Sequence, residues 1–251
     1  MSGLSFDGLT VRYRGLTAVN DVSLDIPHGR IVGLVGESGS GKSTLGRAAV
    51  GLSPVRAGRV LLGGEDITHA KGARRRRLGS RIHLVFQNPH SALDPRMTVG
   101  ETISEALTAH RRLRRSERRS EIDRLLDLLA LDPALASALP GALSGGQRQR
   151  VALARALAVE PEVLIADEIT SALDASVQSA MLTLVRDLRD KLDLTILFIG
   201  HNLGAVRYVA DVIAVLRQGE LVEVAPTDKL FADPRHPYTR GLLDSVPRIG
   251  R

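Results

Sequence analysis

The residue types at positions 36–44 suit phosphate binding. The stretch reads GESGSGKST and fits the P-loop (Walker A) pattern G-x-x-x-x-G-K-[ST], between an apolar run and a helical pattern. Glycines let the backbone turn tightly and aim successive N–H groups inward, and the helix that begins near Lys42 adds its positive N-terminal end. We expect a polyphosphate to be cradled by Gly36, Glu37, Ser38, Gly39, Ser40, Gly41, Lys42, Ser43 and Thr44.

Three side chains of this loop have defined roles in the pattern. Lys42 is expected to reach the β- and γ-phosphates of a nucleoside triphosphate, the Ser43 hydroxyl to ligate Mg²⁺, and Thr44 to add a phosphate-facing hydroxyl. The alternative is a Gly/Ser-rich surface loop without a ligand, which the flanking strand and helix patterns disfavour. Many families share a P-loop, so the reaction must be read from other residues.

Two carboxylates, Asp167 and Glu168, follow an apolar run at residues 163–166. A strand that ends in this way places both at the carboxyl edge of a sheet, where α/β proteins bind ligands. Asp167 is expected to hold Mg²⁺, directly or through water, and Glu168 to polarise the attacking water as general base. A strand end that only caps the next helix is the alternative.

A second glycine-containing segment opens a helical pattern at residues 143–147, which read LSGGQ. Its hydroxyl, glycines and helix N-terminus could clamp phosphate from the opposite side, or Ser144 could be only an N-cap. Together with the P-loop, this segment resembles the signature motif of ATP-binding-cassette (ABC) ATPases. That resemblance implies that Ser144, Gly145, Gly146 and Gln147 act on ATP held by a second subunit, in a head-to-tail dimer.

The same resemblance implies roles for four more residues. Tyr13 resembles the aromatic that stacks on adenine, although an ordinary edge-strand tyrosine is also compatible. Gln87 resembles the glutamine that contacts Mg²⁺ and senses the membrane domain. Asp174, in the segment SALD, matches the loop that crosses the dimer interface. His201 matches the histidine that contacts the γ-phosphate, whereas a lone histidine is more often structural.

Three positions depart from the family's usual residues. Ile169 stands in place of proline, Gly200 in place of serine and Asn202 in place of aspartate. These departures put the rigidity of the turn and the positioning of His201 in question, but they remove no group that the chemistry needs.

Two further segments narrow the resemblance to import ATPases of the oligopeptide, dipeptide and nickel branch. Residues 85–99 read VFQNPHSALDPRMTV, and residues 234–243 read PRHPYTRGLL. We interpret the second segment as a packing helix that marks lineage only.

Composition excludes several classes of site. The 251 residues contain no cysteine, which rules out disulfides, thiolate metal sites and a cysteine nucleophile. The net charge is +6, but aromatic residues are only 3%, and the arginine runs at residues 74–77 and 111–119 fit solvated helix faces better than a nucleic-acid patch. We find no signal-peptide pattern and no apolar run long enough to span a bilayer.

Strand and helix patterns predict an α/β P-loop NTPase with a mostly parallel sheet, an N-terminal antiparallel β part and an inserted helical subdomain. Strands are expected at residues 4–11, 22–26, 31–35, 81–86, 163–166, 194–199 and 212–216, with a short strand and turn at residues 60–67. Helices are expected at residues 42–52, 98–110, 116–131, 176–192, 227–232 and 238–246, and residues 143–147 are expected to open a helix that runs through residues 148–159. We expect one ABC ATPase domain over residues 1–251, with a core at 1–87 and 144–225, a helical subdomain at 88–143 and a tail at 226–251.

The resemblance implies an ATP- and Mg²⁺-dependent ATPase subunit on the cytoplasmic face of the bacterial plasma membrane. Its partners would be a second ATPase subunit, identical or related, two transmembrane permease subunits and an extracellular substrate-binding protein, with no nucleic acid. The cargo would be an oligopeptide, a dipeptide or a nickel chelate. A soluble ABC ATPase acting on nucleic acid or ribosomes is the alternative, and a P-loop kinase is a third possibility that leaves residues 143–147 and His201 unexplained.

Overall fold

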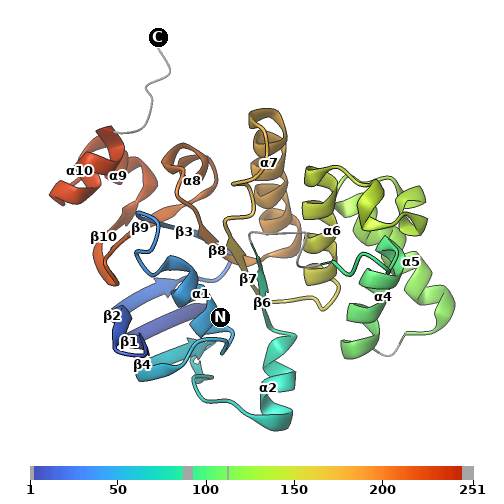
Figure 1. Ribbon diagram of the computed structural model, residues 1–251, viewed down its shortest axis with the longest axis horizontal. Coiled ribbons are helices and arrows are strands. Elements are labelled where there is room, and N and C mark those ends of the chain that lie inside the picture. The colour runs from blue at the N-terminus through green and yellow to red at the C-terminus, as the bar shows by residue number, and fades with distance from the viewer. Residues whose placement is uncertain (1–2, 87–92, 112, 245–251) are drawn as a thin grey trace.

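The computed structural model describes residues 3–86, 93–111 and 113–244. Two β-sheets with helices packed on them form the centre of the molecule, and a group of helices extends from one end (Figure 1). Gln87 and residues 88–92 lie outside the described residues.

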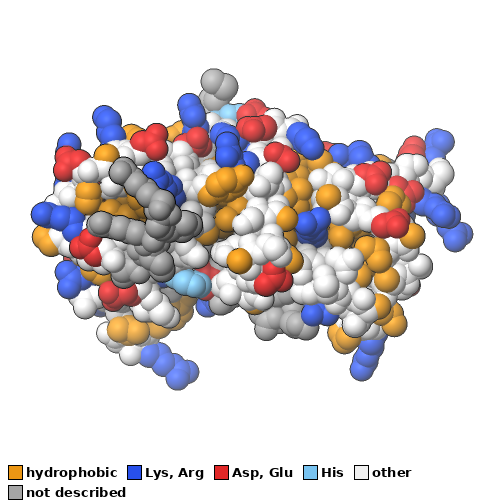
Figure 2. Space-filling view, turned by 90° about the horizontal axis from the view of Figure 1, so that it is seen from above, with side chains coloured by type: hydrophobic (Ala, Val, Ile, Leu, Met, Phe, Trp, Pro, Cys, Tyr) orange, Lys and Arg blue, Asp and Glu red, His pale blue; other side chains and the backbone are white. Residues whose placement is uncertain are grey.

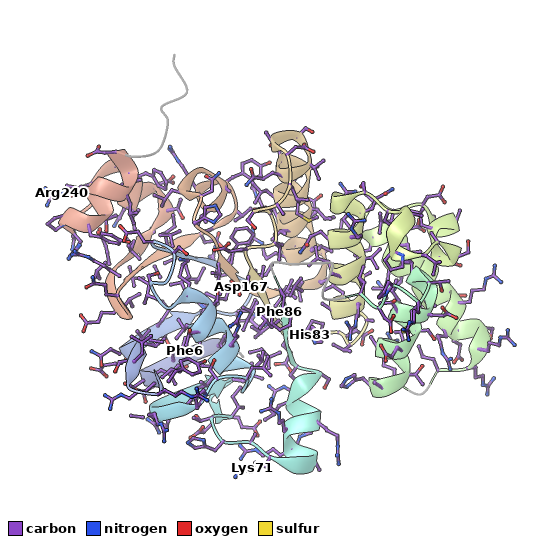
Figure 3. The ribbon with its side chains drawn as sticks, viewed as in Figure 1. Phe6, Lys71, His83, Phe86, Asp167 and Arg240 are labelled. Carbon is purple, nitrogen blue, oxygen red and sulfur yellow. The ribbon has the colours of Figure 1, made fainter. Side chains whose placement is uncertain are left out.

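The first sheet is antiparallel, as the sequence predicts. Its strand order is β2-β1-β4-β5, with β1 at Leu4–Tyr13, β2 at Leu16–Ile26, β4 at Val55–Leu62 and β5 at Glu65–Asp66. Phe6 of β1 lies opposite Leu24 of β2 and Val60 of β4, and all three side chains are buried. Alternate residues of these strands therefore face the interior, where Figure 3 shows Phe6.

The second sheet carries the P-loop and is parallel except at one edge. Its strand order is β10-β9-β3-β8-β7-β6, and only β10 at Glu220–Pro226 runs antiparallel to its neighbour. The other strands are β3 at Ile31–Val35, β6 at Ile82–Val85, β7 at Val163–Asp167, β8 at Thr195–Ile199 and β9 at Val212–Arg217. The predicted α/β fold class is confirmed.

Both faces of this sheet are covered, which explains its uninterrupted apolar strands. Along β3, Ile31 and Val35 belong to one core cluster, whereas Val32 and Leu34 belong to the other. The second cluster includes helix α1 at Lys42–Ala49 and the first sheet. Helices α6 at Gly145–Leu157, α7 at Ala175–Leu192 and α8 at Leu203–Val209 contribute to the first cluster.

The described residues between β6 and α6 form helices joined by turns. Helices α4 at Val99–His110 and α5 at Arg115–Leu128 are followed by the short 3-10 turns η1 at Pro133–Ser137 and η2 at Pro140–Ala142. Thr98 begins α4 with a capping box, because its hydroxyl accepts a hydrogen bond from the Glu101 N–H and Glu101 bonds back to the Thr98 N–H. The C-terminal helices α9 at Thr227–Ala232 and α10 at Pro237–Asp244 lie at the opposite end of the molecule (Figure 1).

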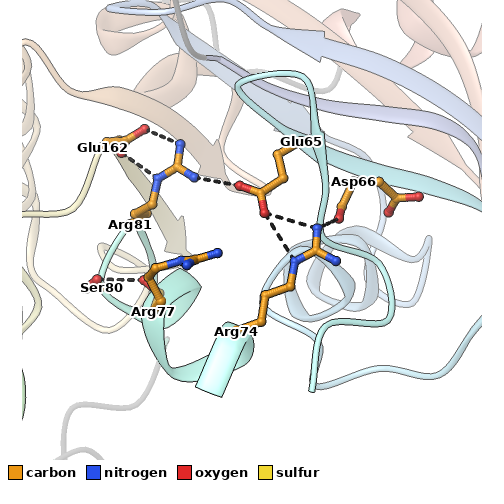
Figure 4. A network of polar contacts seen from close by, with 7 residues as sticks. All are labelled: Glu65, Asp66, Arg74, Arg77, Ser80, Arg81 and Glu162. Carbon is orange, nitrogen blue, oxygen red and sulfur yellow. Dashed lines mark hydrogen bonds and ion pairs between the residues drawn. The ribbon is translucent and has the colours of Figure 1, made fainter. Parts of the chain in front are cut away.

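The sequence prediction did not contain the 3-10 turns η1 and η2, nor three longer elements: α2 at Gly72–Gly79, α8 and β10. Helix α2 contains the arginine run, and only Leu78 is buried, so no apolar periodicity marks it. Its Arg74 pairs with Glu65, which also pairs with Arg81, and Arg81 pairs with Glu162 (Figure 4). Arg75 donates to the carbonyls of Val50 and Gly51. Part of this basic run is therefore used to attach α2 to the sheet.

None of the helices in the described ranges has the length and hydropathy of a membrane span.

Candidate functional site

The P-loop connects β3 to α1, with Gly41 as the N-cap of the helix. Lys42 is 4% exposed, and its ammonium group donates to the carbonyls of Gly36 at 2.8 Å and Glu37 at 2.7 Å. Burial lowers the pKa of Lys42, although the carboxylates of Glu168, Asp167 and Glu37 act in the opposite direction. A buried cation thus lies inside the loop, and the first turn of α1 contains no acidic residue that would repel an anion.

Two glycines allow the loop to pass close to other strands. Gly36 has φ of 153°, and a Cβ there would lie 2.1 Å from the carbonyl oxygen of Leu216 on β9. Gly41 has φ of 107°, and a Cβ there would lie 2.3 Å from the carbonyl oxygen of Ala18 on β2. Any larger residue would push the loop away from both strands, so glycine is required at both positions.

Ser43 and Asp167 form a pair of oxygen groups beside the loop. The Ser43 hydroxyl donates to Asp167 Oδ1 at 2.9 Å, and Asp167 is 3% exposed at the end of β7, near the centre of Figure 3. Burial raises the pKa of Asp167, with a further increase from Glu168, while the Ser43 hydroxyl and the charges of Arg47 and Lys42 oppose it. A hydroxyl and a carboxylate are the hard oxygen ligands that Mg²⁺ prefers, so the predicted pair fits this ion.

Glu168 and His201 come together although 33 positions separate them in the sequence. His201 Nδ1 lies 3.5 Å from Glu168 Oε2, and both residues line a pocket of about 100 Å³. Glu168 has φ of 51°, a left-handed conformation that is uncommon for a residue other than glycine and often occurs at functional sites. Its N–H donates to the carbonyl of Ile199 at the end of β8. Adjacent strands β7 and β8 therefore hold the carboxylate and the imidazole beside each other.

The three departures from the family pattern have structural explanations. Asn202 caps α8, since its side-chain oxygen accepts a hydrogen bond from the Ala205 N–H at 3.2 Å, as an aspartate oxygen would. A Cβ at Gly200 would lie 3.1 Å from Val206 Cγ2, which makes glycine the easy residue there. Ile169 is buried, and because it is not proline it places no steric restriction on the left-handed backbone of Glu168.

The LSGGQ segment forms the start of α6. The Ser144 hydroxyl accepts from the Gln147 N–H at 3.2 Å, and the Gln147 side chain accepts from the Ser144 N–H at 2.9 Å. A Cβ at Gly146 would lie 2.5 Å from Val177 Cγ1, so α6 touches the first turn of α7. Asp174 caps α7 by accepting from the Val177 N–H at 2.9 Å. The signature residues and Asp174 thus belong to two adjoining helix starts, beside an open hollow of about 540 Å³.

The remaining predicted residues are more isolated. Tyr13 lies at the end of β1, where its hydroxyl donates to the Ser53 hydroxyl at 2.6 Å and its side chain is half-exposed. An accessible ring held in this way can stack on a base. Gln87 lies outside the described residues. It directly follows Phe86, the residue labelled in Figure 3. Within the described residues, no hydrogen bond joins Ser144 or Gln147 to residues 36–44.

Sequence reasoning missed two residues that affect the site. Arg47, which lowers the pKa of Asp167, lies one helical turn after Ser43, and this i, i+4 spacing could have identified it. Tyr238 accepts a hydrogen bond from the Glu37 N–H at 3.0 Å. No local signal could have found this contact, because 201 positions separate the two residues.

Comparison with known families identifies the chain. The model of the ABC transporter family matches residues 19–171, which is more than half of the chain. This chain belongs to the ABC transporter ATPase family. The model of the oligopeptide/dipeptide transporter C-terminal region matches residues 222–251 of this ABC ATPase.

Curated relatives cover almost all of this ABC ATPase. A protein of Brucella abortus is 49% identical over 237 residues, which are 94% of this chain and 71% of the relative. A protein of Brucella ovis is 42% identical over 248 residues, which are 97% of this chain and 78% of the relative. Both are named, provisionally, peptide import ATP-binding proteins.

Solved ABC ATPases share the fold. The structure of cbiO1 from Clostridium perfringens, described as part of an ABC transporter complex, has a TM-score of 0.84 and 28% identity, and the match covers 92% of this chain and 90% of that one. A dimeric ATP-binding cassette in a post-hydrolysis state, bound to ADP and phosphate, has a TM-score of 0.81 and 28% identity, covering 89% of this chain and 98% of that one. The chain is therefore an ATPase with the fold of ABC nucleotide-binding subunits.

Proposed function

We propose that this ABC ATPase hydrolyses ATP to drive a bacterial peptide importer. The observation that supports ATP hydrolysis is the convergence at one sheet edge of the buried Lys42, the Ser43–Asp167 pair and the Glu168–His201 pair. These groups follow the neighbouring strands β3, β7 and β8, where ligands of open α/β sheets bind.

Each group has a part in ATP hydrolysis. The Lys42 ammonium leaves the loop carbonyls to bind the β- and γ-phosphate oxygens, while N–H groups of the loop and of α1 bind the remaining oxygens. Ser43 and Asp167 would hold Mg²⁺, which would neutralise charge on the phosphates, and Gln87, which lies outside the described residues, is expected to contact the same ion. Glu168 accepts a proton from the attacking water as general base, and His201 holds the γ-phosphate oxygen. Tyr13 stacks on the adenine ring.

This constellation is half of a site. Ser144, Gly145, Gly146 and Gln147 of a second subunit would clamp the phosphate from the opposite side, with Asp174 at the interface. Ser144 is exposed at a helix N-terminus, so its hydroxyl and the first N–H groups of α6 can reach an anion on another molecule. ATP then favours the closed pair because it binds that state better, and hydrolysis releases it.

Peptide import is favoured over the other cargoes and partners. The C-terminal match and the names of the relatives support a peptide, with a nickel chelate as the related alternative. The subunit would act at the cytoplasmic face of the plasma membrane with two permease subunits and an extracellular binding protein. Figure 2 shows one face on which Lys and Arg side chains are interspersed with Asp and Glu, which gives no continuous basic surface for nucleic acid on that side.

Uptake measured in the source bacterium tests the proposal. Replacing the native chain with Lys42→Ala should abolish uptake of a labelled peptide, whereas Lys71→Ala, the same change at an exposed lysine at the start of α2, should leave it unchanged. A labelled nickel chelate is measured in parallel. Unchanged uptake of both solutes in the Lys42→Ala strain, with ATP hydrolysis stimulated by ribosomes or DNA, would contradict peptide import and favour the soluble alternative.

A further inference from the structure

One peptide unit of the P-loop is held on both sides. The carbonyl of Gly36 accepts a hydrogen bond from Lys42 Nζ at 2.8 Å, and the N–H of Glu37 donates to the Tyr238 hydroxyl at 3.0 Å. These two groups belong to the same planar, trans peptide, so they point in opposite directions. Fixing the N–H outward therefore fixes the carbonyl that faces Lys42.

The position of Tyr238 is itself set by two neighbouring elements. The guanidinium of Arg217, at the end of β9, lies 5.1 Å from the centre of the tyrosine ring. Such a cation over an aromatic face is attractive and holds the ring in one orientation. Tyr238 also packs with its apolar side against the larger core cluster, so its ring is half-buried.

Glu223 of β10 holds the backbone turn that leads into α10. Its carboxylate accepts from the N–H of Arg235 at 2.9 Å and of His236 at 3.0 Å, and His236 Nδ1 accepts from the Tyr238 N–H at 3.1 Å. Burial alone would raise the pKa of Glu223, but hydrogen bonds to its ionised form hold that pKa below its ordinary value. The carboxylate is therefore charged at neutral pH and orders the turn before the tyrosine.

A second contact joins the same region to the loop. The N–H of Gly219, in the turn between β9 and β10, donates to the carbonyl of Ser40 at 2.9 Å. The C-terminal part of the chain thus contacts the loop at Glu37 and at Ser40, the two residues whose backbone hydrogen bond closes a turn of the P-loop. Residues 234–243, which we interpreted from the sequence as a packing helix that marks lineage only, therefore also contact the P-loop through Tyr238.

We propose that Tyr238 is a positioning residue of the nucleotide site, which sets ADP and ATP affinity by fixing the Gly36–Glu37 peptide. The proposal rests on the proposed role of the P-loop and extends the site to the C-terminal region. It gives the motif HPYT at residues 236–239 a structural role. Glu223 and His236 order the turn before α10, and the Tyr238 hydroxyl contacts the P-loop. No part of the proposal requires Tyr238 to touch the nucleotide.

Calorimetric titration of the full-length chain with ADP and Mg²⁺ tests the proposal. Tyr238→Phe removes the hydroxyl but keeps the ring beside Arg217, and we expect the dissociation constant of ADP to rise about fivefold, the worth of one neutral hydrogen bond. Tyr208→Phe is the matched control, because that hydroxyl bonds to Thr183 on α7 instead. The dissociation constant of ADP for Tyr208→Phe should equal that for the native chain.

A double-mutant cycle separates positioning from general stability. Glu223→Ala alone should also weaken ADP binding, but it should add nothing further once Tyr238→Phe is present, because both act through the same hydroxyl. The proposal would be overturned if the dissociation constant of ADP in Tyr238→Phe stayed within twofold of the native value, or if Tyr208→Phe raised it equally. Full additivity of the Glu223→Ala and Tyr238→Phe effects would also overturn it. Lys42→Ala distinguishes failure of the Tyr238 proposal from failure of the proposed P-loop site. If Lys42→Ala binds ADP normally, the proposed P-loop site itself is wrong.

Discussion

At the scale of single residues, the site contains groups that lower the stability of the folded state. Asp167 is a buried carboxylate, Lys42 a buried ammonium and Glu168 a residue with left-handed backbone. Each of these features works against the folded state, and each is compatible with phosphate or metal binding. The departures at Ile169, Gly200 and Asn202 leave these groups in place.

The raised pKa of Asp167 leads to a prediction about pH. The folded chain binds the Asp167 proton more tightly than the unfolded chain does. The stability that this proton contributes at acid pH is therefore lost as the pH rises from 3.8, the ordinary pKa of the carboxyl, through its raised pKa in the folded chain. Asp167→Asn removes the charge and still accepts from Ser43. We expect its free energy of unfolding at pH 8 to exceed that of the native chain by about 0.5–2 kcal/mol, while ATP hydrolysis is lost.

Urea unfolding of both proteins at pH 8 and pH 5 measures this difference. The advantage of Asp167→Asn should shrink toward the lower pH, since the native carboxyl approaches its protonated state there. If the variant is less stable than the native chain at pH 8, burial of the charge is not what raises this pKa.

At the scale of elements, sequence patterns predicted the buried strands well and the surface elements poorly. The apolar runs of β3 and β7 are buried on both faces. The limits of β3 match the predicted residues 31–35, and β7 extends one residue beyond the predicted 163–166, to Asp167. Helix α2 has one buried side chain, α8 has 7 residues and β10 is a half-buried edge strand, so none of them has a long periodic signal. The domain boundaries at residues 88–143 and 226–251 stay predictions.

Motif order placed the site residues at strand ends and helix starts, but their mutual contacts required the fold. The contact between Glu168 and His201 depends on β8 lying beside β7, a strand order that residue types do not encode. The contact between Glu37 and Tyr238 depends on the return of the C-terminal chain to the P-loop. Long-range pairs of this kind have no local signature.

Two helix caps give a prediction at this scale. Thr98 caps α4 and Ser144 caps α6 with the same capping box, so Thr98→Ala and Ser144→Ala should each cost about 1 kcal/mol, or about 2–4 °C in Tm. Only Ser144→Ala should also lower ATP turnover, by at least about tenfold, because only that hydroxyl is proposed to donate to a charged phosphate, a hydrogen bond worth about 1.5–3 kcal/mol.

Calorimetric melting and phosphate release, measured on both variants, check this prediction. Equal losses of turnover in Thr98→Ala and Ser144→Ala would show that the Ser144 hydroxyl serves only to cap its helix.

At the scale of the whole molecule, the residues proposed to bind nucleotide form two separate groups in the described chain. The P-loop, Asp167 and Glu168 lie at the ends of β3 and β7, whereas Ser144 and Asp174 lie at the starts of α6 and α7. Two copies, or this chain and a related one, would each supply what the other lacks. The same pairing would transmit closure to a permease through the helices that precede α6.

The central claim is that Glu168 is the general base of an ATP site shared between two subunits. The most direct measurement is phosphate release by Glu168→Gln, accompanied by light scattering in the presence of ATP. A general base contributes about 10²–10⁴-fold, so we predict a loss of turnover of at least about 100-fold together with a trapped ATP-bound dimer, whereas Lys42→Ala forms no dimer. Full ATPase activity in Glu168→Gln would contradict the account.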